Sequence, residues 1–162
     1  DRDICLINPD GSGEVNLTTN PADDRSPQWS PDGSQILYET GGEVYVMDAD
    51  GSNPANLNDV QPDAEYGLWS PDGSRIVFEK NVGFAHNEIF VMNAGGSGLQ
   101  QLTHAEALNK EPSWSSDGSQ VAFSSNRDGN WEIYVINVDG SGLQNLTNTP
   151  AYDEKSPLWW GP

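Results

Sequence analysis

The sequence predicts an all-β fold built from repeated four-stranded antiparallel units. A decapeptide that combines a turn with a strand occurs three times: SPDGSQILYE at 30–39, SPDGSRIVFE at 70–79 and SSDGSQVAFS at 115–124. Four tryptophans recur with a similar period: Trp29, Trp69, Trp114 and Trp159. The chain also has 17 Gly and 11 Pro among its 162 residues. This composition favours short strands and tight turns over long helices, and a fixed repeat period indicates a repeat architecture.

Each repeat divides into four short strands in a constant order. The first strand ends at the tryptophan, and a Pro-Asp-Gly-Ser turn follows, in which Pro presets φ and Gly accepts a positive φ. The second strands are QILYE, RIVFE and QVAFS, and the third are EVYVMD, EIFVMN and EIYVIN, with DICLIN near the N-terminus. A Gly-rich hairpin turn leads to a short fourth strand that contains NLT or a variant. The third strands are apolar on both faces, so both faces of each sheet should be covered.

Units of this length, stacked face to face, are the blades of a β-propeller. We predict three complete blades, at about 26–58, 66–103 and 111–147, and strands of a split fourth blade. The third and fourth strands of the split blade lie at 3–18, and a first strand lies at 156–160. Joining these pieces would leave a blade without its second strand, with costly unpaired backbone groups. We therefore expect residues 1–162 to be a portion of a longer propeller, or the ring to be completed in an oligomer.

The repeat register also predicts which side chains are buried. Trp29, Trp69 and Trp114 should each pack between neighbouring blades. Cys5 aligns with Tyr45 in the third strands, and we expect it to be a buried, inert thiol.

Strand alternation sorts the connections onto two rims of the disc. Near-identical turns form one rim, where aspartates should hydrogen-bond their own turn backbone: Asp10, Asp32, Asp50, Asp72, Asp117 and Asp139. The irregular connections form the other rim, which carries exposed-looking aromatics and every basic residue except Arg75. Variable loops on a rigid scaffold are typical of recognition surfaces. The predicted partner-binding residues are on or beside this second rim: Asp23, Asp24, Arg25, Asp63, Glu65, Tyr66, Phe84, Lys110, Glu111, Trp131, Asp153, Glu154 and Lys155.

The charge balance and the absence of several motifs reduce the number of possible functions. With 25 acidic and 7 basic residues, the net charge of -18 repels nucleic acid and anionic lipid. No stretch approaches the roughly 18 apolar residues of a membrane helix. We find no nucleophile elbow, no phosphate-binding glycine motif and no cysteine pair for zinc, so we expect no catalysis and no cofactor.

Two groups of residues are candidate metal sites. His86 and His104 could hold a metal with Glu106 or Glu111, although their spacing is not that of a metal motif. Loosely bound calcium is conceivable at the channel mouth, where acidic residues gather: Asp23, Asp24, Asp63, Asp153 and Glu154.

The segment SPQWSPDGSQILYE…GEVYVMDADGSNPANLN at 26–58 resembles the TolB-like propeller repeat, and the resemblance extends over essentially the whole chain. This family includes bacterial periplasmic TolB and propellers associated with peptidases. The resemblance implies a non-catalytic binding module in the periplasm or outside a bacterium, with a protein or glycan partner. By resemblance to TolB, that partner would be the peptidoglycan-associated lipoprotein. The alternative is the substrate-gating propeller of a larger hydrolase, such as a serine peptidase.

Overall fold

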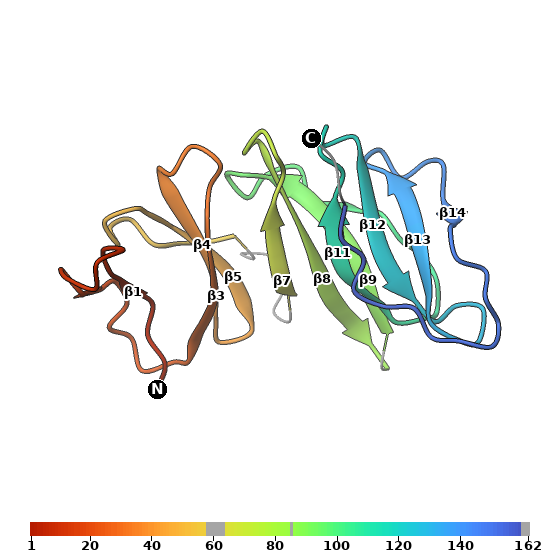
Figure 1. Ribbon diagram of the computed structural model, residues 1–162, viewed down its shortest axis with the longest axis horizontal. Helices are drawn as coiled ribbons and strands as arrows, with labels where there is room; N and C mark the ends of the chain where they lie inside the picture. The colour runs from red at the N-terminus through yellow and green to blue at the C-terminus, as the bar shows by residue number, and fades with distance from the viewer. Residues whose placement is uncertain (58–63, 85, 160–162) are drawn as a thin grey trace.

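The computed structural model describes residues 1–57, 64–84 and 86–159 of the chain. The described residues form three four-stranded antiparallel sheets and one two-stranded sheet, and they contain no helix (Figure 1). The predicted all-β fold with blade-like sheets is therefore confirmed. Each four-stranded sheet runs in sequence order from an innermost to an outermost strand, as in a propeller blade.

The strand bounds follow the repeat. The first blade contains β3 (Asp24–Trp29), β4 (Gln35–Thr40), β5 (Glu43–Asp48) and β6 (Ala55–Asn56). The second contains β7 (Ala64–Trp69), β8 (Arg75–Gly83), β9 (His86–Asn93) and β10 (Gln100–Gln101). The third contains β11 (Asn109–Trp114), β12 (Gln120–Ser125), β13 (Glu132–Asn137) and β14 (Gln144–Asn145). A separate pair, β1 (Cys5–Leu6) and β2 (Val15–Asn16), precedes them.

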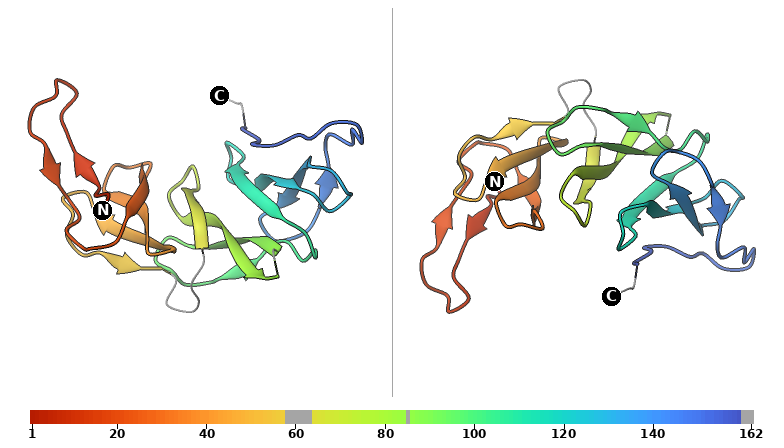
Figure 2. Two further views of the ribbon diagram at one scale, coloured as in Figure 1. Left: turned by 90° about the horizontal axis from the view of Figure 1, so that it is seen from below. Right: turned by 90° about the horizontal axis from the view of Figure 1, so that it is seen from above.

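The blades stand side by side along an arc (Figure 2). The innermost strands β3, β7 and β11 follow its concave side, and the two-residue strands β6, β10 and β14 lie toward its convex side. The β1–β2 pair lies at one end of the arc, and the segment 153–159 runs along the concave side at the other end.

Each blade packs through two unlike faces. We call the side turned toward the next blade in the chain the following face, and the opposite side the preceding face. Aliphatic side chains of the first blade's following face pack on aromatic side chains of the second: Leu37, Val44 and Val46 against Trp69, Phe78 and Phe90. The second and third blades repeat this arrangement: Val77, Ile89 and Val91 against Trp114, Phe123 and Tyr134. The hydrophobic core is thus a series of layers between blades rather than one central cluster.

The expected burial of the tryptophans holds for two of the three. Trp69 and Trp114 are each 8% exposed, and the Trp114 Nε1–H donates a hydrogen bond to the Leu68 carbonyl of the preceding blade (3.1 Å). Trp29 is 48% exposed, so the prediction is wrong there. The reason is that Trp29 lies on the preceding face of the first blade, where the described neighbour is only the short β1–β2 pair.

The prediction of a buried thiol at Cys5 is also wrong, because Cys5 is exposed. Phe90 and Tyr134, at the same repeat position, are buried on preceding faces that a full blade covers. In the described residues no blade covers the preceding face of the β1–β2 pair.

The segment that we expected to be a first strand at 156–160 has no strand pairing over 156–159, and Trp160 lies outside the described residues. The segment nevertheless occupies the place of an innermost strand, since the Ser156 N–H donates to Ser124 Oγ of the third blade (3.0 Å). A strand is defined by pairing, and the described residues contain no second strand of a further blade to pair with. The predicted blade end at 58 also lies outside the described residues.

Candidate functional site

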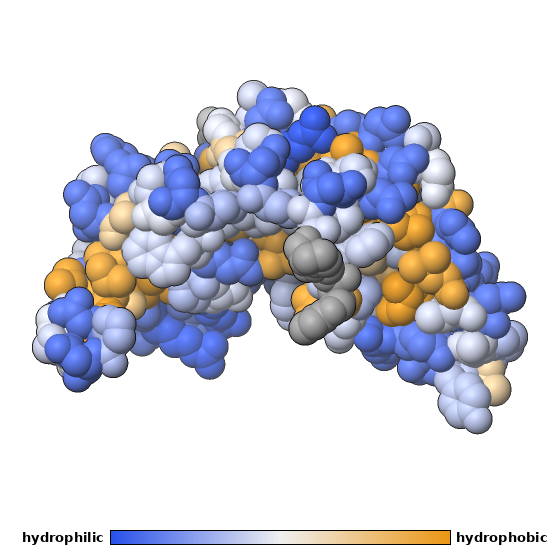
Figure 3. All heavy atoms as spheres, turned by 45° about the horizontal axis from the view of Figure 1, so that its top comes forward, coloured by the Kyte–Doolittle hydropathy of each residue, from blue (hydrophilic) through white to orange (hydrophobic). Residues whose placement is uncertain are grey.

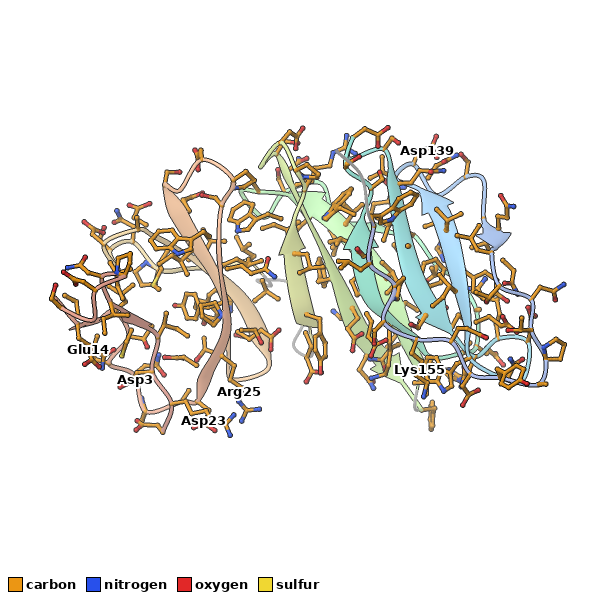
Figure 4. The ribbon with its side chains drawn as sticks, in the orientation of Figure 1. Asp3, Glu14, Asp23, Arg25, Asp139 and Lys155 are labelled. Carbon is orange, nitrogen blue, oxygen red and sulfur yellow. The ribbon has the colours of Figure 1, made fainter. Side chains whose placement is uncertain are left out.

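The two rims predicted from strand alternation are found at opposite ends of the strands. In Figure 4, Asp23, Arg25 and Lys155 lie at the lower end of the molecule and Asp139 at the upper end. We call the upper end, with its Asp-Gly-Ser turns, the turn rim. We call the lower end, with the irregular connections, the variable rim.

The aspartates of the turn rim are occupied by their own turns, as predicted. Asp32 Oδ1 accepts hydrogen bonds from the Ser34 N–H (3.0 Å) and from the hydroxyls of Ser34 (2.8 Å) and Ser30 (2.6 Å). Asp72 and Asp117 repeat this arrangement. Hydrogen bonds to the ionised carboxylate stabilise it, and they lower the pKa of Asp32, Asp72 and Asp117 to about 2. These acids are turn-forming residues.

The first blade contributes an ion pair and a small hollow to the variable rim. Arg25 Nη2 lies 2.9 Å from Asp23 Oδ2, and hydrogen bonding by Arg25 is the main cause that lowers the pKa of Asp23. A hollow of about 170 Å³ opens beside this pair, between Glu39 and Glu65. Asp24 points the other way: it is buried and accepts hydrogen bonds from Asn20 Nδ2 (2.9 and 3.1 Å). The Asp24 carboxylate therefore stabilises the blade and is not exposed for contact with a partner.

The second blade contributes a projecting hairpin. β8 and β9 are longer than the corresponding strands of the other blades, and their pairing continues to Gly83 and His86. Phe84 at the tip is fully exposed and has a φ of +45°, and Val82 is exposed nearby. The Asn81 side chain accepts the Gly83 N–H (2.9 Å), which ties the tip together.

The third blade contributes an aromatic and a lysine that contact each other. Lys155 Nζ lies 4.6 Å from the centre of the Trp131 ring, a cation–π distance. The Trp131 N–H donates to Asp153 Oδ1 (3.0 Å), and the Trp131 carbonyl accepts the Glu154 N–H (2.9 Å). The neighbouring Tyr152 is exposed. The structure therefore brings together four of the predicted site residues and Tyr152.

A repeated contact, which we call the inter-blade clasp, joins an innermost strand to the second strand of the preceding blade. Ser26, Tyr66, Glu111 and Ser156 share a φ of +53° to +57°, an unfavourable conformation for residues other than glycine.

In three of these residues the N–H donates to a side chain at the end of the preceding blade's second strand. Tyr66 donates to Glu39 Oε1 (2.7 Å), Glu111 to Glu79 Oε2 (2.9 Å) and Ser156 to Ser124 Oγ. Burial raises the pKa of Glu39 and Glu79 above the ordinary glutamate value. Lys110, another predicted site residue, lies 3.4 Å from Glu79 and partly compensates this buried charge.

A hollow of about 410 Å³ lies on the concave side between these strands, and Glu39, Tyr66, Glu111 and Ser156 contribute to its wall. The hollow and the exposed side chains of the variable rim together form the candidate binding surface.

Sequence reasoning missed a second buried acidic network. Glu88 accepts hydrogen bonds from the Thr103 hydroxyl and from Asn109 Nδ2, whose Oδ1 in turn accepts Arg127 Nη2 (2.8 Å). Arg127 stacks 4.6 Å from the centre of the Tyr134 ring. The available signal was the recurrence of Glu at the start of the third strand and Thr in NLT, because the same Thr–Glu contact recurs between Thr147 and Glu132 in the third blade.

The described residues show no arrangement of ligands for either predicted metal site. Over residues 1–57, 64–84 and 86–159, no group of three or more His, Cys, Asp or Glu side chains could hold a metal ion. Asp63, one of the predicted calcium ligands and partner contacts, lies outside the described residues. Calcium at the channel mouth stays a prediction. No helix in the described part of the chain is long and apolar enough to cross a membrane.

Three four-stranded antiparallel blades arranged along an arc define a β-propeller structure. Residues 59–160 match the model of the TolB beta propeller domain family, and the chain belongs to this family. No curated protein matches the chain.

Solved structures share the fold at low sequence identity. TolB from Acinetobacter baumannii is 19% identical with a TM-score of 0.56, over 88% of this chain and 48% of that chain. A puromycin-hydrolyzing peptidase from Mycobacterium tuberculosis is 16% identical with a TM-score of 0.74, over 92% and 28%. Oligogalacturonate lyase from Vibrio parahaemolyticus is 12% identical with a TM-score of 0.66, over 88% and 45%. The chain thus spans less than half of each of these proteins, and the likeness concerns the fold alone.

Proposed function

We propose that the chain is a non-catalytic binding module that recognises a protein or glycan partner through the variable rim. The observation that carries this proposal is where the exposed aromatic side chains lie: of the four in the described residues, only Trp29, at the end of β3 beside the turn rim, is elsewhere. Phe84, Tyr152 and Tyr66 are exposed at the variable rim or at the hollow beside it. Aromatic side chains contribute strongly to recognition because they bury a large area with few rotatable bonds.

The charges of the variable rim support a polar partner surface around these aromatics. Arg25 and Lys155 lie on this rim, and Arg25 is paired with Asp23. Mixed charges of this kind set the orientation of a partner more than they set affinity. By resemblance to TolB, the first partner to test is the peptidoglycan-associated lipoprotein, in the periplasm or outside a bacterial cell.

A binding role rather than catalysis is supported by the use of the buried acids. Glu88 and Glu132 accept hydrogen bonds from threonine hydroxyls, and Glu79 accepts the Glu111 N–H. These carboxylates are engaged in holding strands and blades together, which leaves them poorly placed as general acids or bases.

The test is a binding measurement with the purified lipoprotein and, separately, a glycan array, each with and without calcium. A Phe84→Ala/Tyr152→Ala variant is expected to bind at least tenfold more weakly. The matched control is Leu99→Ala, because Leu99 is an exposed apolar residue close to the turn rim. Equal binding by both variants, or a larger loss in the control, would contradict the assignment of the variable rim. A signal that requires calcium would support the predicted loose calcium site.

The second candidate is the propeller portion of a larger hydrolase. It is favoured by the match to only 28% of the puromycin-hydrolyzing peptidase, which indicates that such an array can occur within a larger enzyme. Sequencing the gene on both sides of this segment separates the two candidates. An adjoining domain with a nucleophile elbow would favour the hydrolase.

A further inference from the structure

A hollow of about 230 Å³ lies between the second and third blades at the turn rim. Its wall is apolar where Val91, Met92 and Val138 contribute; Val91 and Met92 are buried, and Val138 is partly buried. In Figure 3, where the turn rim comes forward, apolar surface is visible between the hydrophilic side chains of this rim. The hollow therefore offers apolar contact within a polar surface, between two four-stranded blades that pack on each other.

Two opposite charges from different blades line this hollow without pairing. Arg75 begins β8 of the second blade, and Asp139 lies in the turn after β13 of the third. Within the described residues, the Arg75 guanidinium takes part in no ion pair and no hydrogen bond. Asp139 Oδ1 accepts the N–H (2.9 Å) and the hydroxyl (2.6 Å) of Ser141, and the hydroxyl is the main cause that lowers the pKa of Asp139. The Asp139 carboxylate is therefore ionised at neutral pH.

Comparison of the repeats indicates that the packing of blades does not require these charges. Glutamine takes the position of Arg75 in the other blades, as Gln35 and Gln120. Gly95 of the second blade takes the position of Asp139, so the junction between the first and second blades has neither charge. That junction nevertheless packs through the same kind of apolar layer. The opposite charges of Arg75 and Asp139 therefore suit a ligand better than they suit the fold.

We propose that this hollow binds a free α-amino acid with an apolar side chain. The ligand carboxylate pairs with Arg75, its ammonium group pairs with Asp139, and its side chain lies on the apolar wall at Val91. A zwitterion is favoured over a simple anion, because the net charge of -18 repels anions but not a ligand without net charge. The hollow opens on the turn rim, at the opposite end of the strands from the variable rim, so this site is independent of the proposed function.

The first test titrates the purified, ¹⁵N-labelled chain with L-leucine up to about 50 mM and follows the amide signals by NMR. We expect a Kd of about 1–10 mM, as for a small ligand in an open hollow, with the largest shifts at Asn93 and Val138 in its wall. Leucinamide lacks the carboxylate and N-acetylleucine lacks the ammonium group, so each is expected to bind at least tenfold more weakly. No binding of leucine, or equal binding of all three compounds, would overturn the proposal.

The second test assigns the two charges. Arg75→Gln introduces the residue that the other blades have at this position, so the fold should tolerate it, and leucine should bind at least tenfold more weakly. Asp139→Asn should have a similar effect. Its matched control is Asp50→Asn, because Asp50 holds the equivalent turn of the first blade by accepting the Ser52 N–H (2.9 Å). Circular dichroism checks that each variant is folded. Unchanged binding by Arg75→Gln, or equal losses in Asp139→Asn and Asp50→Asn, would contradict the site.

Discussion

The burial difference between Trp114 and Trp29 gives a quantitative test of the blade-packing model. Both end an innermost strand, but Trp114 is 8% exposed and Trp29 is 48% exposed. A fully buried tryptophan removes about 200 Å² from water, which corresponds to about 5 kcal/mol at about 25 cal/mol per Å². The burial contribution is therefore about 4.5 kcal/mol for Trp114 and about 2.5 kcal/mol for Trp29. The Trp114 hydrogen bond to the Leu68 carbonyl adds about 1 kcal/mol.

We expect Trp114→Ala to lower the free energy of unfolding by about 4–5 kcal/mol and Trp29→Ala by about 2 kcal/mol. Trp69→Ala is an internal check. Trp69 is as buried as Trp114, but its Nε1 has no hydrogen-bond partner in the described structure, so its loss should be about 1 kcal/mol smaller than that of Trp114.

The assay is urea unfolding followed by circular dichroism, because removing tryptophans changes fluorescence directly. At about 2–4 °C per kcal/mol, the Trp114 and Trp29 variants should also differ clearly in melting temperature. Equal losses at the two positions would refute the reasoning, because they would mean that cover by a preceding blade does not determine the contribution of this residue. All measurements are made at one low protein concentration, so that self-association does not contribute.

The remaining predictions concern the clasp, pH and the turns. Glu79→Ala should destabilise by about 2–3 kcal/mol, because it leaves the Glu111 N–H without its acceptor, whereas Glu79→Gln should cost under about 1 kcal/mol in urea unfolding; equal losses would rule out the acceptor role. Burial raises the folded-state pKa of Glu39 and Glu79, so their contribution to stability is fully present below the ordinary value of 4.5 and is lost as the pH rises through the folded-state pKa. Asp72, with a folded-state pKa of about 2, contributes above its ordinary value of 3.8 and loses this contribution as the pH falls toward 2. The melting temperature measured against pH should therefore rise from neutral pH toward 4.5 and fall below 3.8; a steady decrease from pH 7 to 4.5 would contradict this assignment. Asp72→Ala should lower the melting temperature at pH 7 more than at pH 2, because the turn carboxylate is fully ionised only at pH 7; equal shifts would exclude its role in the turn.

The sequence alone predicts the contacts within a blade far better than the contacts between blades. The turns were predictable because Asp32, Ser34 and their glycine are neighbours in the chain, and their hydrogen bonds depend only on local geometry. The inter-blade clasp was not predictable, since Glu39 and Tyr66 are separated by 27 residues and belong to different blades. Their contact depends on how one blade sits on the next.

Trp29 and Cys5 were predicted to be buried and are exposed, because their burial also depends on contacts between blades. Their repeat positions are those of buried residues, and periodicity alone assigns them the same environment. Periodicity reports the face on which a side chain lies, but it does not report whether a neighbour covers that face. The variable rim was predictable as a surface because its loops differ from blade to blade. The exposure of individual side chains on this rim was not predictable, as the burial of Asp24 shows.

The unlike faces of each blade also have a consequence for how such a protein can change length. Every blade offers an aliphatic side to its successor and an aromatic side to its predecessor, so one gene segment encodes both halves of a self-compatible joint. Unequal recombination between two repeats would insert or delete a whole blade and leave each new junction chemically matched. Such an event would alter the extent of the arc and the number of loops on the variable rim without a mutation in any junction. The loops could then diverge without changing the apolar layers between the blades.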